Sequence, residues 1–320
     1  MVGRILNSSS QYRDAVYESK TLSRAAILRG ILRTLALLPL PVAHGLGAMV
    51  GQLVAWLPTE LRRVTDTNLA LCFPEMPSAQ RRRLATASLR EMGKQLLETG
   101  IVWYCGEKRL QRLVVNPDSL DRIASHWPAG RGLLLAGPHL GNWELVSLYV
   151  NRRFRVHNLY RPPRQRDLEP LLVEVRERTG ARSLPATPNG IRTLYRALKE
   201  GGLVGILPDQ EPKDSGHFAP FFAMQAKTMT LLCQMASRTG APVLFTFMER
   251  LPWGRGFRLH VVPAPAGIDD PDAAVATAAL NKGVEQCVRM APHQYQWSYK
   301  RFRQQPDGKP NPYKTRHASA

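Results

Sequence analysis

A histidine and a glutamate five residues apart form the pair in this sequence best suited to moving a proton. They lie in the stretch Gly-Pro-His139-Leu-Gly141-Asn-Trp-Glu144. An imidazole held by a carboxylate can take a proton from a hydroxyl group. On one continuous helix the two side chains would point ~140° apart, so they can meet only if the chain bends, which Gly141 permits. The alternative is a surface histidine beside a helix whose first turn carries a dipole-favoured glutamate.

The residues around this pair predict a strand, a loop and a helix. The apolar run Leu133-Leu-Leu-Ala136 is typical of a buried strand, and the Gly-Pro dipeptide after it ends that strand. Asn142 can serve as the N-cap of a helix that runs to Tyr149. The histidine is therefore expected in the loop, and the glutamate in the first turn of the helix.

Three predicted strands end on polar residues, namely His139, Arg161 and Asp209. Ligands of open α/β sheets bind beyond the carboxyl ends of the strands. A guanidinium beside a proton-transfer site could bind a phosphate or stabilise a developing oxyanion, and an aspartate could orient that arginine. Taken singly, Arg161 and Asp209 could equally be turn residues. Their coincidence at three strand ends favours a site.

The order of the apolar patterns predicts an α/β fold, with a mostly parallel sheet flanked by helices. Predicted strands cover 133–136, 156–160, 203–207, 243–248 and 257–262, and predicted helices cover 78–104, 168–179, 188–200 and 227–239.

The segment 216–224 carries three phenylalanines, Phe218, Phe221 and Phe222, together with a methionine. An exposed loop seldom carries so many large apolar side chains without burying them. They either fold back on the core or line an apolar ligand groove, and both alternatives stay open. His217 could be a second acid or base, or a solvated loop residue.

The chain is strongly basic, with 44 Lys and Arg against 25 Asp and Glu among 320 residues, a net charge of +19. Such an excess indicates an anionic partner: nucleic acid, a membrane surface, or an acidic protein or phosphorylated substrate. No nucleic-acid motif is present, because aromatic residues are not interleaved with the basic runs. The four scattered cysteines and the His-x4-Glu spacing match neither a zinc site nor a disulfide framework, so we predict no metal.

The N-terminal part favours membrane attachment. The apolar run 35–57 is long enough to cross a bilayer, but prolines, His44 and Gln52 interrupt it, and arginines flank both ends. A span, a helix lying in the cytoplasmic leaflet and a buried core helix remain alternatives. The predicted organisation is a membrane-associating segment at 1–60, an α/β domain at 61–308 and a flexible basic tail at 309–320.

Nearly the whole chain, from about Leu35 to Gly308, resembles the late acyltransferases of lipid A synthesis, the lauroyl/myristoyl acyltransferases. The matching motifs are Leu37–Pro41 (LLPLP), Asn68–Glu75 (NLALCFPE), His139–Glu144 (HLGNWE), Tyr160–Pro162 (YRP), Pro208–Gln210 (PDQ), Phe218–Phe222 (FAPFF), Ala226 with Thr228, Ala291–Tyr295, Trp297, Arg301-Phe302 and Pro306–Gly308.

The resemblance implies transfer of a fatty acyl group from acyl carrier protein to a hydroxyl of a 3-hydroxyacyl chain on a lipid A precursor. This reaction takes place at the cytoplasmic face of the inner membrane and needs no cofactor. His139 would be the general base and Glu144 its charge partner. Arg161, Asp209, Asn142 and Arg164 would bind substrate or support the oxyanion. Phe218, Phe221 and Phe222 would line a groove for the acyl chain.

Two departures from the family pattern bear on substrate preference. Ala223 replaces a common glycine, and Tyr299-Lys300 stands where His-Arg is frequent. The rival hypotheses are an acyltransferase for another glycolipid or glycerolipid, a thioester hydrolase, and a non-catalytic basic protein that binds membranes or nucleic acid.

Overall fold

The computed structural model describes residues 24–213 and 215–314. The first residues of the predicted N-terminal segment (1–23) and the end of the predicted basic tail (315–320) lie outside the described residues.

A six-stranded sheet forms the centre of the molecule, in the order β3-β2-β4-β1-β7-β8. Its strands are β1 (Leu133–Ala136), β2 (Val156–Tyr160), β3 (Arg182–Pro185), β4 (Leu203–Ile206), β7 (Val243–Arg250) and β8 (Phe257–Pro263). All neighbours pair in parallel except β7 and β8, which form an antiparallel hairpin. The predicted α/β fold with a mostly parallel sheet is confirmed.

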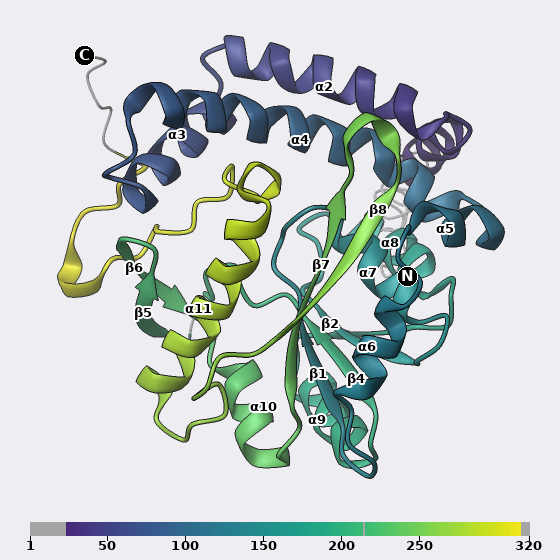
Figure 1. Cartoon of the computed structure of the whole chain (residues 1–320), viewed down its shortest axis with the longest axis vertical. Helices are drawn as coiled ribbons and strands as arrows, with labels where there is room; N and C mark the ends of the chain where they lie inside the picture. Colours follow the sequence, from purple (N-terminus) through teal and green to yellow (C-terminus); the bar gives the residue numbers. More distant parts are fainter. Residues whose placement is uncertain (1–23, 214, 315–320) are drawn as a thin grey trace, which may run out of the picture.

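Helices cover both faces of this sheet (Figure 1). The helices after β1 are α7 (Trp143–Val150), α8 (Glu169–Glu177), α9 (Pro188–Lys199), α10 (Leu231–Thr239) and α11 (Ala273–Met290). Strand β1 explains why both faces must be covered, because its side chains alternate between two cores. Leu134 and Ala136 join the core under α9, α10 and α11, whereas Leu133 and Leu135 join the core under α7 and α8.

The predicted strands 133–136 and 156–160 coincide with β1 and β2, and the helix predicted at 78–104 coincides with α4 (Ser78–Tyr104). The helix predicted from Lys227 is wrong at its start, because Lys227 and Thr228 belong to a strand. A separate hairpin, β5 (His217–Phe221) and β6 (Met224–Thr228), occupies the segment expected to be a loop. It turns at Phe222, whose φ is +51°.

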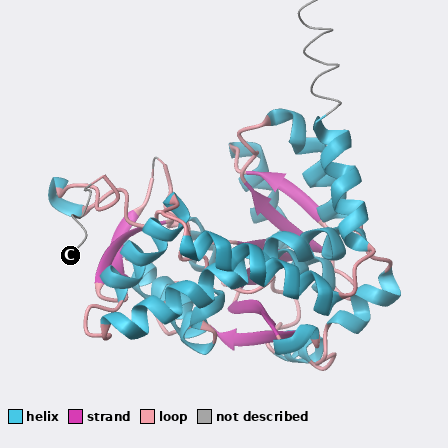
Figure 2. Ribbon diagram, turned by 90° about the horizontal axis from the view of Figure 1, so that it is seen from above, coloured by secondary structure: helices cyan, strands magenta, loops and turns pink. Residues whose placement is uncertain are grey.

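Long N-terminal helices lie across one end of the sheet, as Figure 2 shows from above. The described N-terminal elements are a helix at 24–36, α2 (Leu40–Trp56), α3 (Glu60–Cys72), α4, α5 (Glu107–Leu113) and α6 (Ser119–Ser125). Helices α2 and α4 pack backbone against backbone, since a Cβ at Gly51 would lie 2.1 Å from the carbonyl oxygen of Leu89. Among the described residues no single helix is long and apolar enough to cross a membrane, whereas α2 and α3 together, bent by 80°, pass on length and composition.

Helix α2 exposes large apolar residues and buries small ones. Its buried face consists of Leu40, Ala43, His44, Gly47, Gly51 and Ala55. The exposed stripe consists of Val42, Leu46, Met49, Val50, Leu53 and Trp56 within α2, continued by Leu57 after the helix. The helix carries no charged residue, and the stripe keeps helical spacing over its whole length. An uncharged, outward-facing apolar stripe is typical of a surface that contacts a partner or a membrane.

Candidate active site

His139 and Asp209 meet because their strands are neighbours in the sheet. Ala136 of β1 pairs in register with Ile206 of β4, and each functional residue follows three positions later. Asp209 Oδ1 lies 2.7 Å from His139 Nδ1, and Asp209 Oδ2 accepts the backbone N–H of His139 at 2.9 Å. The carboxylate therefore holds both the ring and the backbone of the histidine. The prediction that Asp209 orients Arg161 is replaced by this pairing.

The pairing sets which ring nitrogen of His139 can act as a base. With Nδ1–H donating to Asp209, Nε2 carries the free lone pair. The side-chain amide of Gln210 lies 3.2 Å from Nε2 and also donates to Gln296 at 3.2 Å. Burial would raise the pKa of the Asp209 carboxyl, but the charge and hydrogen bonds of His139 outweigh burial, so this pKa lies below its usual value of 3.8. An ionised Asp209 supports the tautomer that a general base needs.

The structure pairs Glu144 with Arg176 of α8 and not with His139. The guanidinium donates to both carboxylate oxygens, at 2.9 and 2.5 Å. Burial would raise the pKa of the Glu144 carboxyl, but the charge of Arg176 lowers it below its usual value, and His139 contributes a smaller attraction. This geometry corrects the predicted direct pairing of the motif's two ends. The chain does bend at Gly141 (φ +60°), but the bend starts α7 so that Glu144 meets α8.

The loop between His139 and Glu144 is held in place by hydrogen bonds from its backbone N–H groups to carbonyls of other segments. Gly141 N–H donates to the carbonyl of Gln294 at 3.1 Å, and Asn142 N–H donates to that of Met248 at 2.8 Å. A Cβ at position 141 would lie 1.9 Å from the Met248 oxygen, so only glycine fits there. The predicted cap is present, since Asn142 Oδ1 accepts the N–H of Leu145 at 3.0 Å.

Asn142 also joins a buried ionic network beneath the loop. Its amide donates to Glu98 Oε1 at 2.8 Å, and Glu98 is fully buried. Arg250 of β7 donates to Glu98 and Glu91, and His44 of α2 lies 2.7 Å from Glu98. Because Asn142 is 0% exposed with both amide atoms engaged, it positions the loop. The prediction that it touches substrate is corrected.

The network predicts acid sensitivity of the fold. Burial would raise the pKa of Glu98, but the charge and hydrogen bonds of Arg250 lower it from 4.5 to about 2. A folded-state pKa below the unfolded one stabilises the fold above pH 4.5, and this stabilisation is lost as the pH falls toward about 2. We expect the free energy of unfolding, measured by urea titration, to fall by on the order of 2–3 kcal/mol from this group over that window.

The matched variant is Glu98→Gln, which removes this titration while Glu91 still pairs with Arg250. Its stability should depend less steeply on pH below pH 4.5 than that of the unchanged chain. Equal slopes for the two proteins would contradict the assignment.

Arg161 and Arg164 lie at the same edge of the sheet, after β2, which is separated from β1 by β4. Both side chains are exposed, and neither makes a hydrogen bond or ion pair with another described residue. The structure thus brings His139 and Asp209 together and leaves these two arginines at the rim, open to a ligand.

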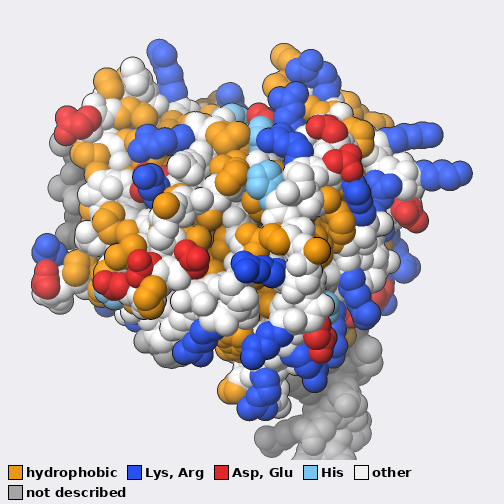
Figure 3. Space-filling view, turned by 60° about the horizontal axis from the view of Figure 1, so that its bottom comes forward, with side chains coloured by type: hydrophobic (Ala, Val, Ile, Leu, Met, Phe, Trp, Pro, Cys, Tyr) orange, Lys and Arg blue, Asp and Glu red, His pale blue; other side chains and the backbone are white. Residues whose placement is uncertain are grey.

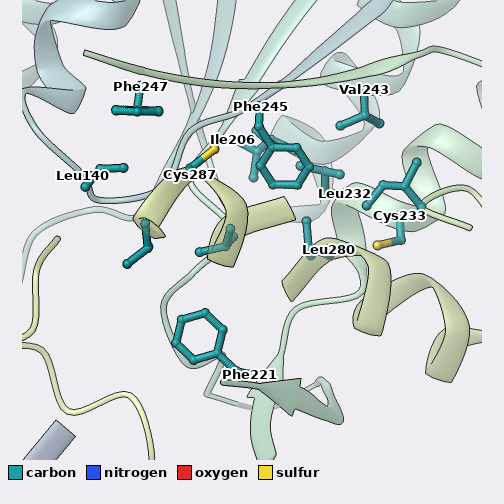
Figure 4. Packing of buried hydrophobic residues seen from close by; sticks show 14 of the residues in the cluster. Leu140, Ile206, Phe221, Leu232, Cys233, Val243, Phe245, Phe247, Leu280 and Cys287 are labelled. Atoms are coloured by element: carbon teal, nitrogen blue, oxygen red, sulfur yellow. The ribbon is translucent and has the colours of Figure 1, made fainter. Parts of the chain in front are cut away.

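The three phenylalanines are not equivalent. Phe221 is 1% exposed and belongs to the main core, and Figure 4 shows its ring beside α11. Phe222 is half-buried against Phe73 and Trp297, with ring centroids 4.9 and 5.8 Å away. The predicted open groove is therefore wrong for Phe221, because the β5–β6 hairpin folds this side chain into the core. Phe218 remains half-buried.

Four residues with clear structural roles were not predicted from the sequence: Gln210, Arg176, Glu98 and Arg250. Glu98 lies on the helix predicted at 78–104, where a polar residue on the buried face could have indicated it. The others act through contacts between elements distant in sequence, for which the sequence gives no local signal.

The chain matches the family model for bacterial lipid A biosynthesis acyltransferases over residues 18–304. It is 31% identical to the lipid A biosynthesis lauroyltransferase of Escherichia coli (strain K12) over 287 residues, which cover 89% of this chain and 92% of the relative. The palmitoleoyltransferase of the same strain is 30% identical over 89% of this chain and 92% of the relative. A phosphatidylinositol mannoside acyltransferase of Mycobacterium tuberculosis (strain CDC 1551 / Oshkosh) is 26% identical over 75% of each chain.

These matches cover both residues that meet at the centre of the site, His139 and Asp209, and the strands that carry them. The chain belongs to the bacterial lipid A biosynthesis acyltransferase family and is an O-acyltransferase.

Proposed function

We propose that this protein transfers a fatty acyl group from acyl carrier protein to the hydroxyl of a 3-hydroxyacyl chain on a lipid A precursor. In this proposal His139 is the general base. The observation that carries the proposal is the hydrogen bond of His139 Nδ1 to the buried Asp209 carboxylate, 2.7 Å long, at the carboxyl ends of two adjacent strands. An aliphatic alcohol is a poor nucleophile at neutral pH, so attack on a thioester requires its proton to be removed.

The reaction follows from which nitrogen of His139 is free. The acceptor hydroxyl displaces the Gln210 amide from Nε2 and gives its proton to this nitrogen while its oxygen attacks the thioester carbon. Asp209 stabilises the imidazolium that forms. The tetrahedral intermediate collapses with cleavage of the C–S bond, and the leaving thiolate takes the proton from Nε2. In this proposal the Gln210 amide, 3.2 Å from Nε2 before it is displaced, then donates to the oxyanion.

Glu144 has an indirect part in this proposal. Its bidentate ion pair with Arg176 ties the first turn of α7, which follows the His139 loop, to α8. The exposed Arg161 and Arg164 at the rim would bind the anionic part of a substrate. Acyl carrier protein is acidic, and lipid A precursors carry phosphates, so both substrates suit a chain with a net charge of +19. Figure 3 shows lysine and arginine spread over one face of the molecule, with fewer acidic residues among them.

The acceptor is a lipid, so the protein must reach a membrane surface. The apolar stripe of α2 supports attachment to a membrane, which in this proposal is the inner membrane, at its cytoplasmic face. An amphipathic helix lying in the interface would bury this stripe among the acyl chains, with the arginines of the preceding helix near the head groups.

A second acceptor class is a phosphorylated glycolipid other than a lipid A precursor. The similarity to the phosphatidylinositol mannoside acyltransferase favours it, because the alignment with that relative covers 75% of this chain. Such an enzyme would use the same base and thioester but a different hydroxyl.

Mass spectrometry of lipid A from cells with and without this chain tests the acceptor. The proposal predicts that lipid A from cells lacking it is missing one ester-linked acyl group, and the missing mass gives the chain length. Unchanged lipid A together with an altered glycerolipid or glycolipid would favour the second acceptor class.

A further inference from the structure

The tip of the β7–β8 hairpin holds a tryptophan out in solvent. This tip is the short 3₁₀ turn η2 (Pro252–Gly254), closed by a hydrogen bond from Leu251 N–H to Gly256 O at 2.9 Å. Trp253 is 88% exposed, the highest value among the exposed large hydrophobic residues. Its φ is +62°, a left-handed backbone conformation that bulky residues rarely adopt. The turn therefore holds an indole in solvent, in a backbone conformation that favours glycine.

The hairpin tip and the apolar stripe of α2 belong to one surface. A Cβ at Gly254 would lie 2.6 Å from the Cα of Pro41, so the tip sits directly against the first turn of α2. Figure 1 shows the hairpin reaching up to the N-terminal helices. Leu37, 81% exposed, lies in the turn that leads into α2. The exposed apolar side chains thus continue from α2 through this turn toward the tip.

The distribution of charge around this surface favours a lipid bilayer as its partner. Helix α2 carries no Lys, Arg, Asp or Glu, whereas exposed arginines lie next to the hairpin tip (Arg255 and Arg258) and on the helix before α2 (Arg24 and Arg33). Tryptophan favours the boundary between acyl chains and head groups, and arginine favours anionic head groups. An apolar centre with a basic border is the arrangement that an anionic bilayer surface complements.

We infer that Trp253 is a second anchor, through which the β7–β8 hairpin inserts into the bilayer interface beside α2. The inference rests on the membrane attachment contained in the proposed function. It adds a specific consequence, because the Met248 carbonyl of β7 accepts the N–H of Asn142 in the loop that carries His139, and Arg250 of β7 binds Glu98 beneath that loop. Two anchors on separate elements fix the orientation of the protein. The carboxyl ends of β1 and β7 then face the lipid.

Binding of the full chain to vesicles of phosphatidylethanolamine with a minority of phosphatidylglycerol tests the inference. The variants are Trp253→Ser, Trp253→Phe and the control Val275→Ser, which removes a 44% exposed apolar residue on α11. We expect Trp253→Ser to lower the partition coefficient by about tenfold, which corresponds to about 1.4 kcal/mol, while Trp253→Phe and Val275→Ser stay within about twofold of the unchanged chain. Thermal melts check that each variant is folded, as expected for a substitution at an exposed turn.

Quenching by lipids with brominated acyl chains gives an independent readout. In a Trp56→Phe background, which removes the exposed tryptophan of the α2 stripe, Trp253 should be quenched, and the quenching should disappear when Trp253→Phe is added. If the unchanged chain binds and Trp253→Ser binds equally well, the inference is overturned and the membrane attachment stands. If the folded, unchanged chain does not bind the vesicles, the Trp253 anchor and the membrane attachment are both wrong. Acyl transfer can then still be tested in detergent. A change in oligomeric mass on Trp253→Ser without lipid would assign the surface to a second copy of this chain and overturn the inference.

Discussion

Replacement of His139 by Asn is expected to lower acyl transfer by roughly 10²–10⁴-fold, the contribution of a positioned general base. Asparagine keeps an amide N–H near the position of Nδ1, so Asp209 retains a donor in place of the bond now 2.7 Å long. The variant lacks Nε2, which takes the proton from the acceptor hydroxyl. The fold should survive, because Asp209 is not left buried and unpaired.

The measurement is the initial rate of acyl transfer with purified protein, together with the melting temperature. His139→Ala is the harsher companion variant, since it leaves the 3% exposed Asp209 without the histidine side chain, and it should lose both activity and stability. If His139→Asn kept its rate within a few-fold, the base would have to be another group.

Asp209→Asn is expected to lower the rate by roughly 10²–10⁴-fold through the tautomer of His139. The carboxylate accepts two hydrogen bonds, one from Nδ1–H and one from the backbone N–H of His139. Asparagine has only one side-chain oxygen, so its NH₂ group must face one of these two donors. When it faces the ring, it donates to Nδ1 and leaves the proton on Nε2, where it blocks the base.

The tautomer can be measured separately from the rate by ¹⁵N NMR on histidine-labelled protein, with the His139 signals assigned by their absence in His139→Asn. We expect Nδ1 to be protonated in the unchanged chain and Nε2 in Asp209→Asn. Glu144→Gln is the matched control, because Glu144 bonds Arg176 and not the ring. It should leave the tautomer unchanged even if the rate falls. A tautomer change in Glu144→Gln and none in Asp209→Asn would reverse the roles given to these two carboxylates.

The parts of the fold that depend on local signals could be predicted. Strands β1 and β2 are short apolar runs with turn residues at their ends, and the predicted bounds match the structure. The cap at Asn142 and the bend at Gly141 were visible for the same reason. In each case the neighbouring residues in the sequence decide the conformation.

The partners within the site could not be predicted, because they depend on the order of the strands. Asp209 is 70 positions from His139, and only the adjacency of β1 and β4 brings them together. The sequence indicated that both lie at the same edge, but not that they are neighbours. Glu144 was assigned to His139 because it is nearby in the chain, whereas α8 brings Arg176 closer in space.

The prediction of a groove at the β5–β6 hairpin was wrong at Phe221 for a different reason. The pattern of Phe221 and Phe222 has the composition of a groove and of a core, and only the packing of α11 decides between them. Helix α11 buries Phe221, and Glu285 of that helix accepts the backbone N–H of Phe222 at 2.6 Å.

The most direct test of the central claim is a reaction in detergent with purified protein, an acyl thioester of acyl carrier protein and a lipid A precursor. The lipid product is weighed by mass spectrometry, and the free thiol is counted. The account predicts one added ester-linked acyl group per thiol released, with the product nearly absent in His139→Asn. Release of thiol with only free fatty acid formed, or an undiminished yield in His139→Asn, would contradict it.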